Sequence, residues 1–190
     1  MRKKNQEIRD EQILEEMLSQ ATICRVAMTD QEAPYLLAFN YGYRNRVIYI
    51  HSATAGKKID LLRENPRVCF EIESKSELVK GGNACDWSTT YRSIVGYGNV
   101  EIVTDSAQKK EGLQIIMSQH GAPELNVFKE KNVDSVVILK LAIDSMTGKQ
   151  SGNWDRVHKR SLIELETDRL ESDHERVKPV YRTGRIYPLK

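Results

Sequence analysis

Six stretches rich in β-branched and aromatic residues, most of them separated by short polar connections, constrain the fold of this chain more than any other feature. They lie at 22–28, 34–43, 46–52, 68–73, 91–103 and 133–146. Short connections favour antiparallel pairing, because a parallel crossover needs a dozen or more residues. The pattern therefore predicts a mainly β fold with flanking helices. About six antiparallel strands with segregated helices favour a barrel.

The strand expected at 68–73 has the clearest pattern. Val68, Phe70 and Ile72 alternate with more polar neighbours, which is the period of a half-buried strand. We expect these three side chains to face the core. The stretches at 34–43 and 46–52 are separated by a short turn, and we expect them to pair as a hairpin.

Three helices are expected between the strands. The first spans 7–20 with Asp10 as its N-cap. The second is short and should end at Pro66. The third occupies 106–120 and should end at Gly121. Their expected core-facing residues are Ile13, Leu14, Met17, Leu18, Leu113, Ile116, Met117 and His120.

The length and charge of the chain limit the classes of partner. The 190 residues are expected to form one domain at 1–152, followed by a charged extension at 153–190. This extension either packs on the surface, docks a partner subunit or is partly disordered. The net charge of +2 gives no reason to expect nucleic acid or an anionic membrane. A small molecule or another protein is the expected partner.

Targeting and redox signals indicate a cytoplasmic protein. No apolar run approaches the roughly 20 residues that span a bilayer, and the basic start of the chain lacks the apolar stretch of a signal peptide. The cysteines Cys24, Cys69 and Cys85 match no metal-binding or disulfide pattern. We expect buried structural thiols, with a catalytic cysteine as the alternative. The four histidines have no spacing typical of a metal site, and no metal is expected.

The segment HSATAGKKID at 51–60 carries the strongest chemical signal. It places Lys57 and Lys58 at a helix start, where the positive end of the helix dipole disfavours cations. A phosphate would satisfy both the lysines and the free backbone N–H groups. Ser52 or Thr54 could cap this helix, and Gly56 would let the backbone approach a ligand. The alternative is a pair of solvated surface lysines.

A second candidate region, CDWSTTYRSIVGYG, spans 85–98. Its Tyr91, Arg92 and Ser93 could hydrogen-bond a ligand, or they could lie in a dimer interface, where Tyr and Arg are enriched.

His51 precedes the lysine pair. It could be structural, or it could act as a proton donor, metal ligand or cofactor contact.

Together these motifs resemble the pyridoxamine 5′-phosphate oxidase-related flavoproteins. The resemblance rests on APYLLAFNYGYRNRVIYIHSATAGKKIDLLRENPRVCFEIE followed by CDWSTTYRSIVGYGNVEIV. More narrowly, the chain is similar to the nitroimidazole-reductase (Nim-type) branch, whose members carry HSAxxGKK and a YRS-type strand with glycines. The similarity covers roughly 1–152. It implies an FMN-binding split β-barrel that forms a homodimer with a cofactor site at each subunit interface.

The resemblance also assigns candidate roles to individual residues. It places the FMN phosphate near Ser52, Lys57 and Lys58, and His51 near the flavin or the substrate. Backbone contacts to the flavin ring would come from Phe39, Asn40 and Tyr41, and the other subunit would contribute Tyr91, Arg92 and Ser93. The additional arginine and lysine motifs that bind the substrate phosphate in true pyridoxamine phosphate oxidases are not found, which argues against vitamin B6 synthesis.

The expected function is that of an FMN-dependent oxidoreductase. Electrons would pass from a nicotinamide or another reductant, through the flavin, to a small electrophile such as a nitroaromatic. His51 is the one candidate acid–base residue. Two alternatives remain open: a haem-binding or haem-degrading protein of the same fold, in which a histidine would ligate iron, and a non-enzymatic flavin-binding or redox-sensing protein.

Overall fold

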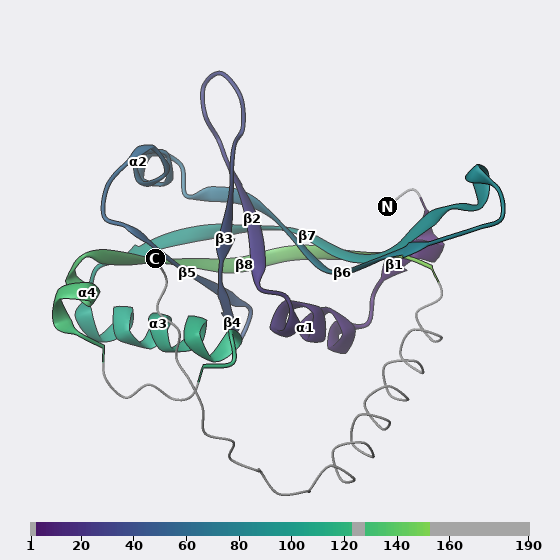
Figure 1. The fold of residues 1–190 in the computed structure, drawn as a ribbon. Helices are drawn as coiled ribbons and strands as arrows, with labels where there is room; N and C mark the ends of the chain where they lie inside the picture. Colours follow the sequence, from purple (N-terminus) through teal and green to yellow (C-terminus); the bar gives the residue numbers. More distant parts are fainter. Residues whose placement is uncertain (1–2, 123–127, 153–190) are drawn as a thin grey trace, which may run out of the picture. The chain divides into compact units, whose positions relative to one another are not determined.

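A computed structural model describes residues 3–122 and 128–152 of the chain, and these form one curled sheet with helices on both sides (Figure 1). The strands are β1 (Glu7–Ile8), β2 (Ile23–Met28), β3 (Tyr35–Asn40), β4 (Gly42–Arg44), β5 (Val47–Ala53), β6 (Arg67–Val79), β7 (Ser88–Val103) and β8 (Val136–Ser151). Their order is β3-β2-β6-β7-β8-β5-β4, and β1 pairs with β8. Every pairing is antiparallel, as the sequence predicts.

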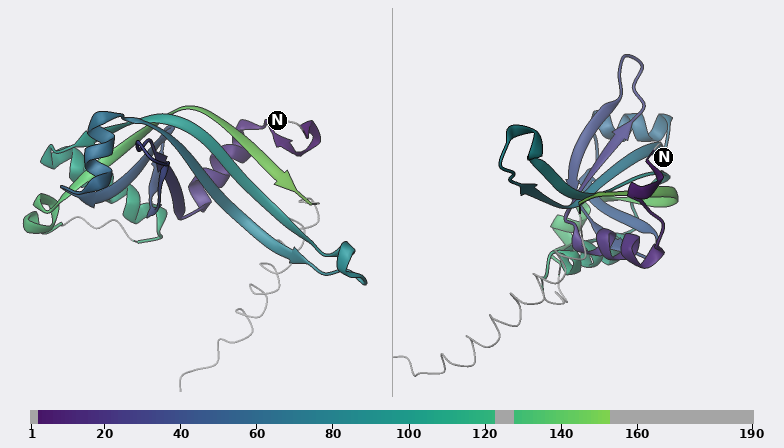
Figure 2. Two further views of the ribbon diagram at one scale, coloured as in Figure 1. Left: turned by 90° about the horizontal axis from the view of Figure 1, so that it is seen from above. Right: turned by 90° about the vertical axis from the view of Figure 1, so that its right-hand side faces the viewer.

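The connection between β3 and β4 explains why the sheet curls. These strands occupy opposite ends of the strand order, yet Tyr41 alone separates them in the chain. Such a short link forces the two ends of the sheet toward each other, and Figure 2 shows the resulting curvature. The arrangement confirms the expected mainly β split barrel. The described residues form eight strands rather than about six, because the short β1 leaves no clear sequence pattern and the stretch at 34–43 divides into β3 and β4 at Tyr41.

The hairpin expected between 34–43 and 46–52 is only partly correct. Gly42–Arg44 pairs with β5, whereas Tyr35–Asn40 pairs with β2 instead. The break comes at Tyr41, whose side chain is fully buried and whose hydroxyl donates to the Leu18 carbonyl at 2.7 Å. Burying this aromatic ring in the core redirects the chain from one sheet edge to the other.

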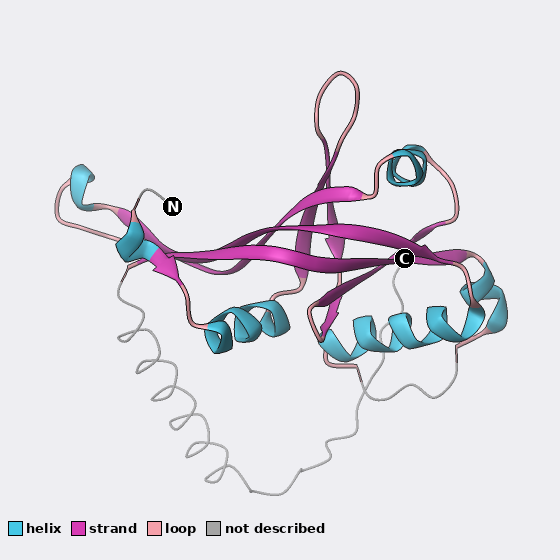
Figure 3. Cartoon of the chain, turned by 180° about the vertical axis from the view of Figure 1, so that it is seen from behind, coloured by secondary structure: helices cyan, strands magenta, loops and turns pink. Residues whose placement is uncertain are grey.

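The helices lie close to their expected positions. They are α1 (Glu11–Gln20), α2 (Lys57–Glu64), α3 (Ser106–Gln119) and the short α4 (Glu130–Asp134), with 3-10 turns η1 (Lys4–Gln6) and η2 (Ala84–Asp86). Asp10 caps α1 as predicted and accepts from the Gln12 N–H at 2.9 Å. Helices α1 and α3 lie on one side of the sheet and α2 on the other (Figures 1 and 3).

Several expected boundaries and faces need correction. The chain at 7–8 forms β1 rather than helix, and the last strand begins at Val136 after α4. The face of α3 is also displaced, since Lys109, Gly112, Ile115 and Ile116 are buried whereas Met117 and His120 are not. Gly112 allows this face to pack closely on β8, because a Cβ there would lie only 2.9 Å from the Ile138 side chain.

The core occupies the inside of the curled sheet. Val68, Phe70 and Ile72 are at most 2% exposed, which confirms their expected orientation. Within the described residues, no helix is long and apolar enough to cross a membrane. The extension expected at 153–190 lies outside the described residues.

Candidate functional site

The start of α2 lies directly after β5, as the sequence predicts, but no side chain caps it. Gly56 is the N-cap residue, with a φ of 116° that glycine adopts without strain. The expected caps are wrong: no Thr54 cap forms, and the buried Ser52 hydroxyl donates to the Ala53 carbonyl at 3.1 Å. A Cβ added at Gly56 would meet nothing within 4 Å. The approach at Gly56 is therefore open, and no side chain accepts from the first-turn N–H groups, although the Ile59 N–H donates to the Gly56 carbonyl at 2.8 Å.

Lys57 has a negative partner within the chain. Its Nζ lies 2.6 Å from Asp30 Oδ2, in the loop between β2 and β3, and 4.9 Å from the centre of the Tyr35 ring. The hydrogen bond to Asp30 raises the pKa of Lys57 and lowers the pKa of Asp30. Sequence reasoning missed Asp30, because no local pattern relates a loop carboxylate to a lysine 27 positions later.

Lys58 differs from its neighbour. Its side chain is half-buried, and it forms no ion pair with any residue that the structure describes. The lysine pair therefore contains one cation neutralised by Asp30 and one without such a partner. Together with the uncapped N–H groups, Lys58 gives the start of α2 the character of an anion site.

The remaining candidates near α2 differ in accessibility. His51 is exposed on β5, opposite Ile138 of β8, whereas the neighbouring Ser52 faces the core. Phe39 is half-buried against the core and Asn40 is exposed. The Tyr41 side chain belongs to the core, and burial raises the pKa of its hydroxyl. Tyr41 can therefore offer a ligand its backbone but not its ring.

The second candidate region lies on β7. Tyr91, Arg92 and Ser93 are half-buried and pair with the last residues of β8. The Arg92 Nε donates to Gln150 Oε1 at 3.2 Å, and the Lys149 Nζ lies 5.2 Å from the centre of the Tyr91 ring. This part of β7 carries polar groups that are already held in place by the neighbouring strand.

The two candidate regions do not meet within one chain. His51 pairs with Ile138 near the start of β8, and Ser93 pairs with Lys149 near its end. A strand advances about 3.3 Å per residue, so these positions are separated by roughly 35 Å along β8. Figure 1 shows the same separation, with α2 and the β6–β7 hairpin at opposite ends of the sheet.

The cysteines and acidic residues form no metal-ligand cluster among the described residues. No group of three or more metal-binding side chains occurs there. All three cysteines are free, and burial raises the pKa of Cys24, which keeps its thiol protonated. Cys69 is half-buried and Cys85 is exposed, so the expectation of buried thiols is confirmed only at Cys24.

Comparison with known proteins identifies the family. The pyridoxamine 5′-phosphate oxidase family profile matches residues 10–150. The chain belongs to the pyridoxamine 5′-phosphate oxidase family. The match runs from α1 to the penultimate residue of β8, and hence includes both candidate regions. No curated protein matches the chain.

Solved structures support the same assignment. The chain is 34% identical to a candidate 5-nitroimidazole antibiotic resistance protein from Bacteroides thetaiotaomicron, with a TM-score of 0.68 over 76% of this chain and 86% of that one. An FAD- and haem-binding protein from Mycobacterium smegmatis is 21% identical, with a TM-score of 0.69 over 78% and 75%. A flavocytochrome from Azotobacter vinelandii is 18% identical, with a TM-score of 0.69 over 80% and 72%. The last two likenesses concern the fold alone.

Proposed function

We propose that this chain is an FMN-dependent oxidoreductase that reduces a small electrophile such as a nitroaromatic. The observation that carries the proposal is the start of α2, where no side chain caps the helix, the approach at Gly56 is open, and Lys58 has no ion-pair partner among the described residues. This combination suits the phosphate of FMN. The likeness to a candidate nitroimidazole resistance protein at 34% identity supports the substrate class.

The residues at the start of α2 fit a phosphate with little rearrangement. The backbone N–H groups of Lys57 and Lys58 and the Lys58 ammonium would donate to its oxygens. Lys57 would contribute without leaving Asp30, since an ammonium group has three donors and the 2.6 Å contact uses one of them. Gly56 leaves the approach clear. FMN would supply the electron-transfer chemistry when bound.

The other proposed contacts position the ring and exclude water. The backbone at Phe39, Asn40 and Tyr41 would lie along the ring, where the buried Tyr41 side chain holds the strand break fixed. The exposed His51 would hydrogen-bond the ring or the substrate. A nicotinamide or another reductant would donate the electrons. His51 is the candidate for proton donation to the reduced substrate.

We propose a homodimer with the site at the subunit interface, because the two candidate regions lie roughly 35 Å apart along β8 of one chain. They can reach one small cofactor only if different subunits supply them. Exposed apolar side chains support an interface in this region. They are Ile23, Leu36, Leu78, Val79, Trp87, Val95 and Tyr97, five of them on β6, β7 or the connecting hairpin loop.

The absorbance spectrum of the purified protein tests the cofactor. We expect a yellow protein with flavin bands, and NAD(P)H-dependent reduction of a nitroaromatic. A Soret band would favour the haem alternative instead. A protein that binds flavin but does not turn over would be a flavin-binding or redox-sensing protein. A colourless protein that binds neither cofactor would refute the proposal.

The phosphate role is tested by comparing FMN with riboflavin, which has the same ring but no phosphate. We expect Lys57→Ala with Lys58→Ala to weaken FMN binding about ten-fold or more, because each lost charged hydrogen bond contributes roughly 1.5 kcal/mol or more. Riboflavin binding, measured by fluorescence quenching, should change little. An equal loss of affinity for FMN and for riboflavin would indicate a folding defect. An unchanged FMN affinity would refute the phosphate site.

A further inference from the structure

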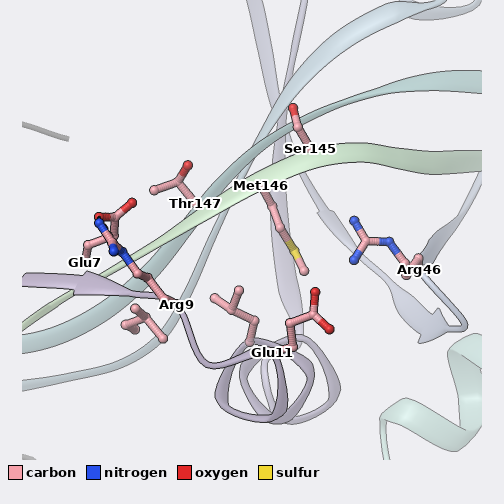
Figure 4. Close-up of a pocket in the computed structure, with 9 residues that line it drawn as sticks. Glu7, Arg9, Glu11, Arg46, Ser145, Met146 and Thr147 are labelled. Atoms are coloured by element: carbon pink, nitrogen blue, oxygen red, sulfur yellow. Dashed lines mark hydrogen bonds and ion pairs between the residues drawn. The ribbon is translucent and has the colours of Figure 1, made fainter.

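A cavity lies away from α2. It has a volume of about 450 Å³, within the range of roughly 300–1,000 Å³ typical of small-molecule sites. Its walls come from β1, the start of α1, the turn between β4 and β5, and the middle of β8 (Figure 4). The turn precedes β5 and α2 follows it, so the cavity lies at the other end of β5 from the proposed phosphate site.

The floor of the cavity is apolar and firmly packed. Ile8 and Leu14 are 5% and 6% exposed, and Met146 packs against the core. A Cβ at Gly148 would lie 2.5 Å from Leu14 and 2.8 Å from Ile8, so the missing side chain lets α1 and β1 close on β8. Methionine adapts its shape to an apolar ligand. The floor therefore suits an aliphatic or thioether side chain.

The rim carries two opposite charges that do not pair with each other. Figure 4 shows Arg46 on one side of the cavity and Glu11 at the start of α1. Neither side chain forms an ion pair with another residue in the described part of the chain. Arg9 is also on the rim, but its guanidinium is held by Glu7 at 2.9 Å. Arg46 and Glu11 are thus available to a ligand that carries both charges.

Arg46 occupies a backbone position that favours glycine. Its φ is 61°, and together with Asn45 (φ 52°) it forms the two-residue turn of the β4–β5 hairpin. Asn-Gly is the preferred pair for such turns. The backbone is held by bonds from the Arg46 N–H to the Tyr43 hydroxyl at 3.1 Å and from the Ile143 N–H to the Arg46 carbonyl at 3.0 Å. An arginine at this position indicates a role for its side chain.

We propose that this cavity binds a free α-amino acid with an aliphatic or thioether side chain. The Arg46 guanidinium donates to the carboxylate, because its fork of N–H groups matches two carboxylate oxygens. The Glu11 carboxylate accepts from the ammonium group. The amino-acid side chain lies against Met146 and Leu14. A ligand with only one of the two charges leaves one rim residue without its partner.

Calorimetric titration of the full-length protein with L-leucine and L-methionine tests this site. N-acetyl-L-leucine lacks the positive charge and L-leucinamide lacks the carboxylate, so each should bind about ten- to a hundred-fold more weakly than L-leucine, the effect expected for one charged hydrogen bond. Absence of binding by both amino acids up to about 10 mM would overturn the proposal, since affinities weaker than this are negligible. Equal binding of L-leucine and its blocked derivatives would also overturn it.

Arg46→Gly is the decisive variant, because glycine relaxes the positive φ and should leave the fold intact. We expect its affinity for L-leucine to fall about ten-fold or more, with an unfolding midpoint no lower than that of the wild type. Arg9→Gln is the matched control. It removes a cation from the same rim, but this cation is already paired with Glu7. L-leucine binding should therefore change less than about two-fold. Unchanged binding in Arg46→Gly, or an equal loss in both variants, would contradict the assignment.

Discussion

Asp30 changes the interpretation of the lysine pair at the residue scale. The sequence poses two cations at a helix start without an evident counterion, but the structure gives Lys57 an intramolecular carboxylate. No side chain caps the first-turn N–H groups, and Lys58 has no ion-pair partner among the described residues. The anion site therefore has fewer available cations than the sequence motif suggests. Lys58 is its main side-chain cation, and Lys57 is shared with Asp30.

The Asp30–Lys57 pair predicts a pH dependence of stability. The lowered pKa of Asp30 gives a contribution that is present above its unfolded value, near 3.9, and is lost as pH falls through the folded value. The raised pKa of Lys57 gives a contribution that is present below about 10.4 and is lost as pH rises through the folded value. Asp30→Asn should therefore lower the urea midpoint slightly at intermediate pH, and the difference should disappear in acid and in strong base.

Glu32→Gln provides the control for this prediction. It removes the same charge from the same loop, but Glu32 forms no ion pair with the residues that the structure describes. Its urea midpoint should follow that of the wild type across the whole pH series. If the urea midpoint of the wild type exceeds that of Asp30→Asn by the same amount at pH values of about 2 to 3, the ion-pair assignment is contradicted.

At the element scale, the packing of β4 on α3 depends on a close approach. A Cβ at Gly42 would lie 2.6 Å from the backbone of Ile115, and a helix backbone cannot move aside as a flexible side chain can. Gly42→Ala should therefore lower the free energy of unfolding by about 1–3 kcal/mol, the usual cost of overpacking. Urea unfolding measures the effect.

Gly82→Ala is the matched substitution for Gly42→Ala. Nothing lies within 4 Å of the added Cβ at Gly82, so the free energy of unfolding should stay within about 0.5 kcal/mol of the wild type. Similar losses in both variants would show that the close contact between β4 and α3 does not decide the result.

The sequence predicts local features better than pairings between distant elements. The alternation of Val68, Phe70 and Ile72 is a local pattern, and the structure confirms it. Asp10 also caps its own helix through neighbouring N–H groups. By contrast, the pairing of β3 with β2 depends on where the Tyr41 ring is buried, and the buried face of α3 depends on contact between Gly112 and Ile138. These determinants act between residues far apart in the chain, so local periodicity does not reveal them.

The same distinction applies to the candidate site. The motif at 51–60 predicts the helix start and its lysines correctly, because they lie within ten residues. It does not predict that Asp30 engages Lys57 or that Gly56 replaces Ser52 and Thr54 at the cap. The separation of His51 from Ser93 along β8 is a consequence of sheet register, which only the assembled sheet reveals.

At the scale of the whole molecule, the separation of the two candidate regions allows a direct test of the proposed dimer. One variant, Lys57→Ala with Lys58→Ala, damages the phosphate region, and a second, Arg92→Ala, damages the β7 region. Each homodimer then carries the same lesion in both of its sites. Coexpression with two different tags, followed by two affinity steps, isolates a heterodimer with one subunit of each kind.

If each site combines the α2 region of one subunit with the β7 region of its partner, both lesions of the heterodimer fall in the same site and the other site is intact. FMN content should then be about half that of a doubly tagged wild-type dimer, as the two-fold symmetry of such an interface requires. Both homodimers should stay nearly empty at the same FMN concentration. If each site is built within one subunit, both sites of the heterodimer are damaged and its FMN content should be no higher than that of the homodimers. That result, or a wild-type protein that sediments as a monomer, would refute the shared site.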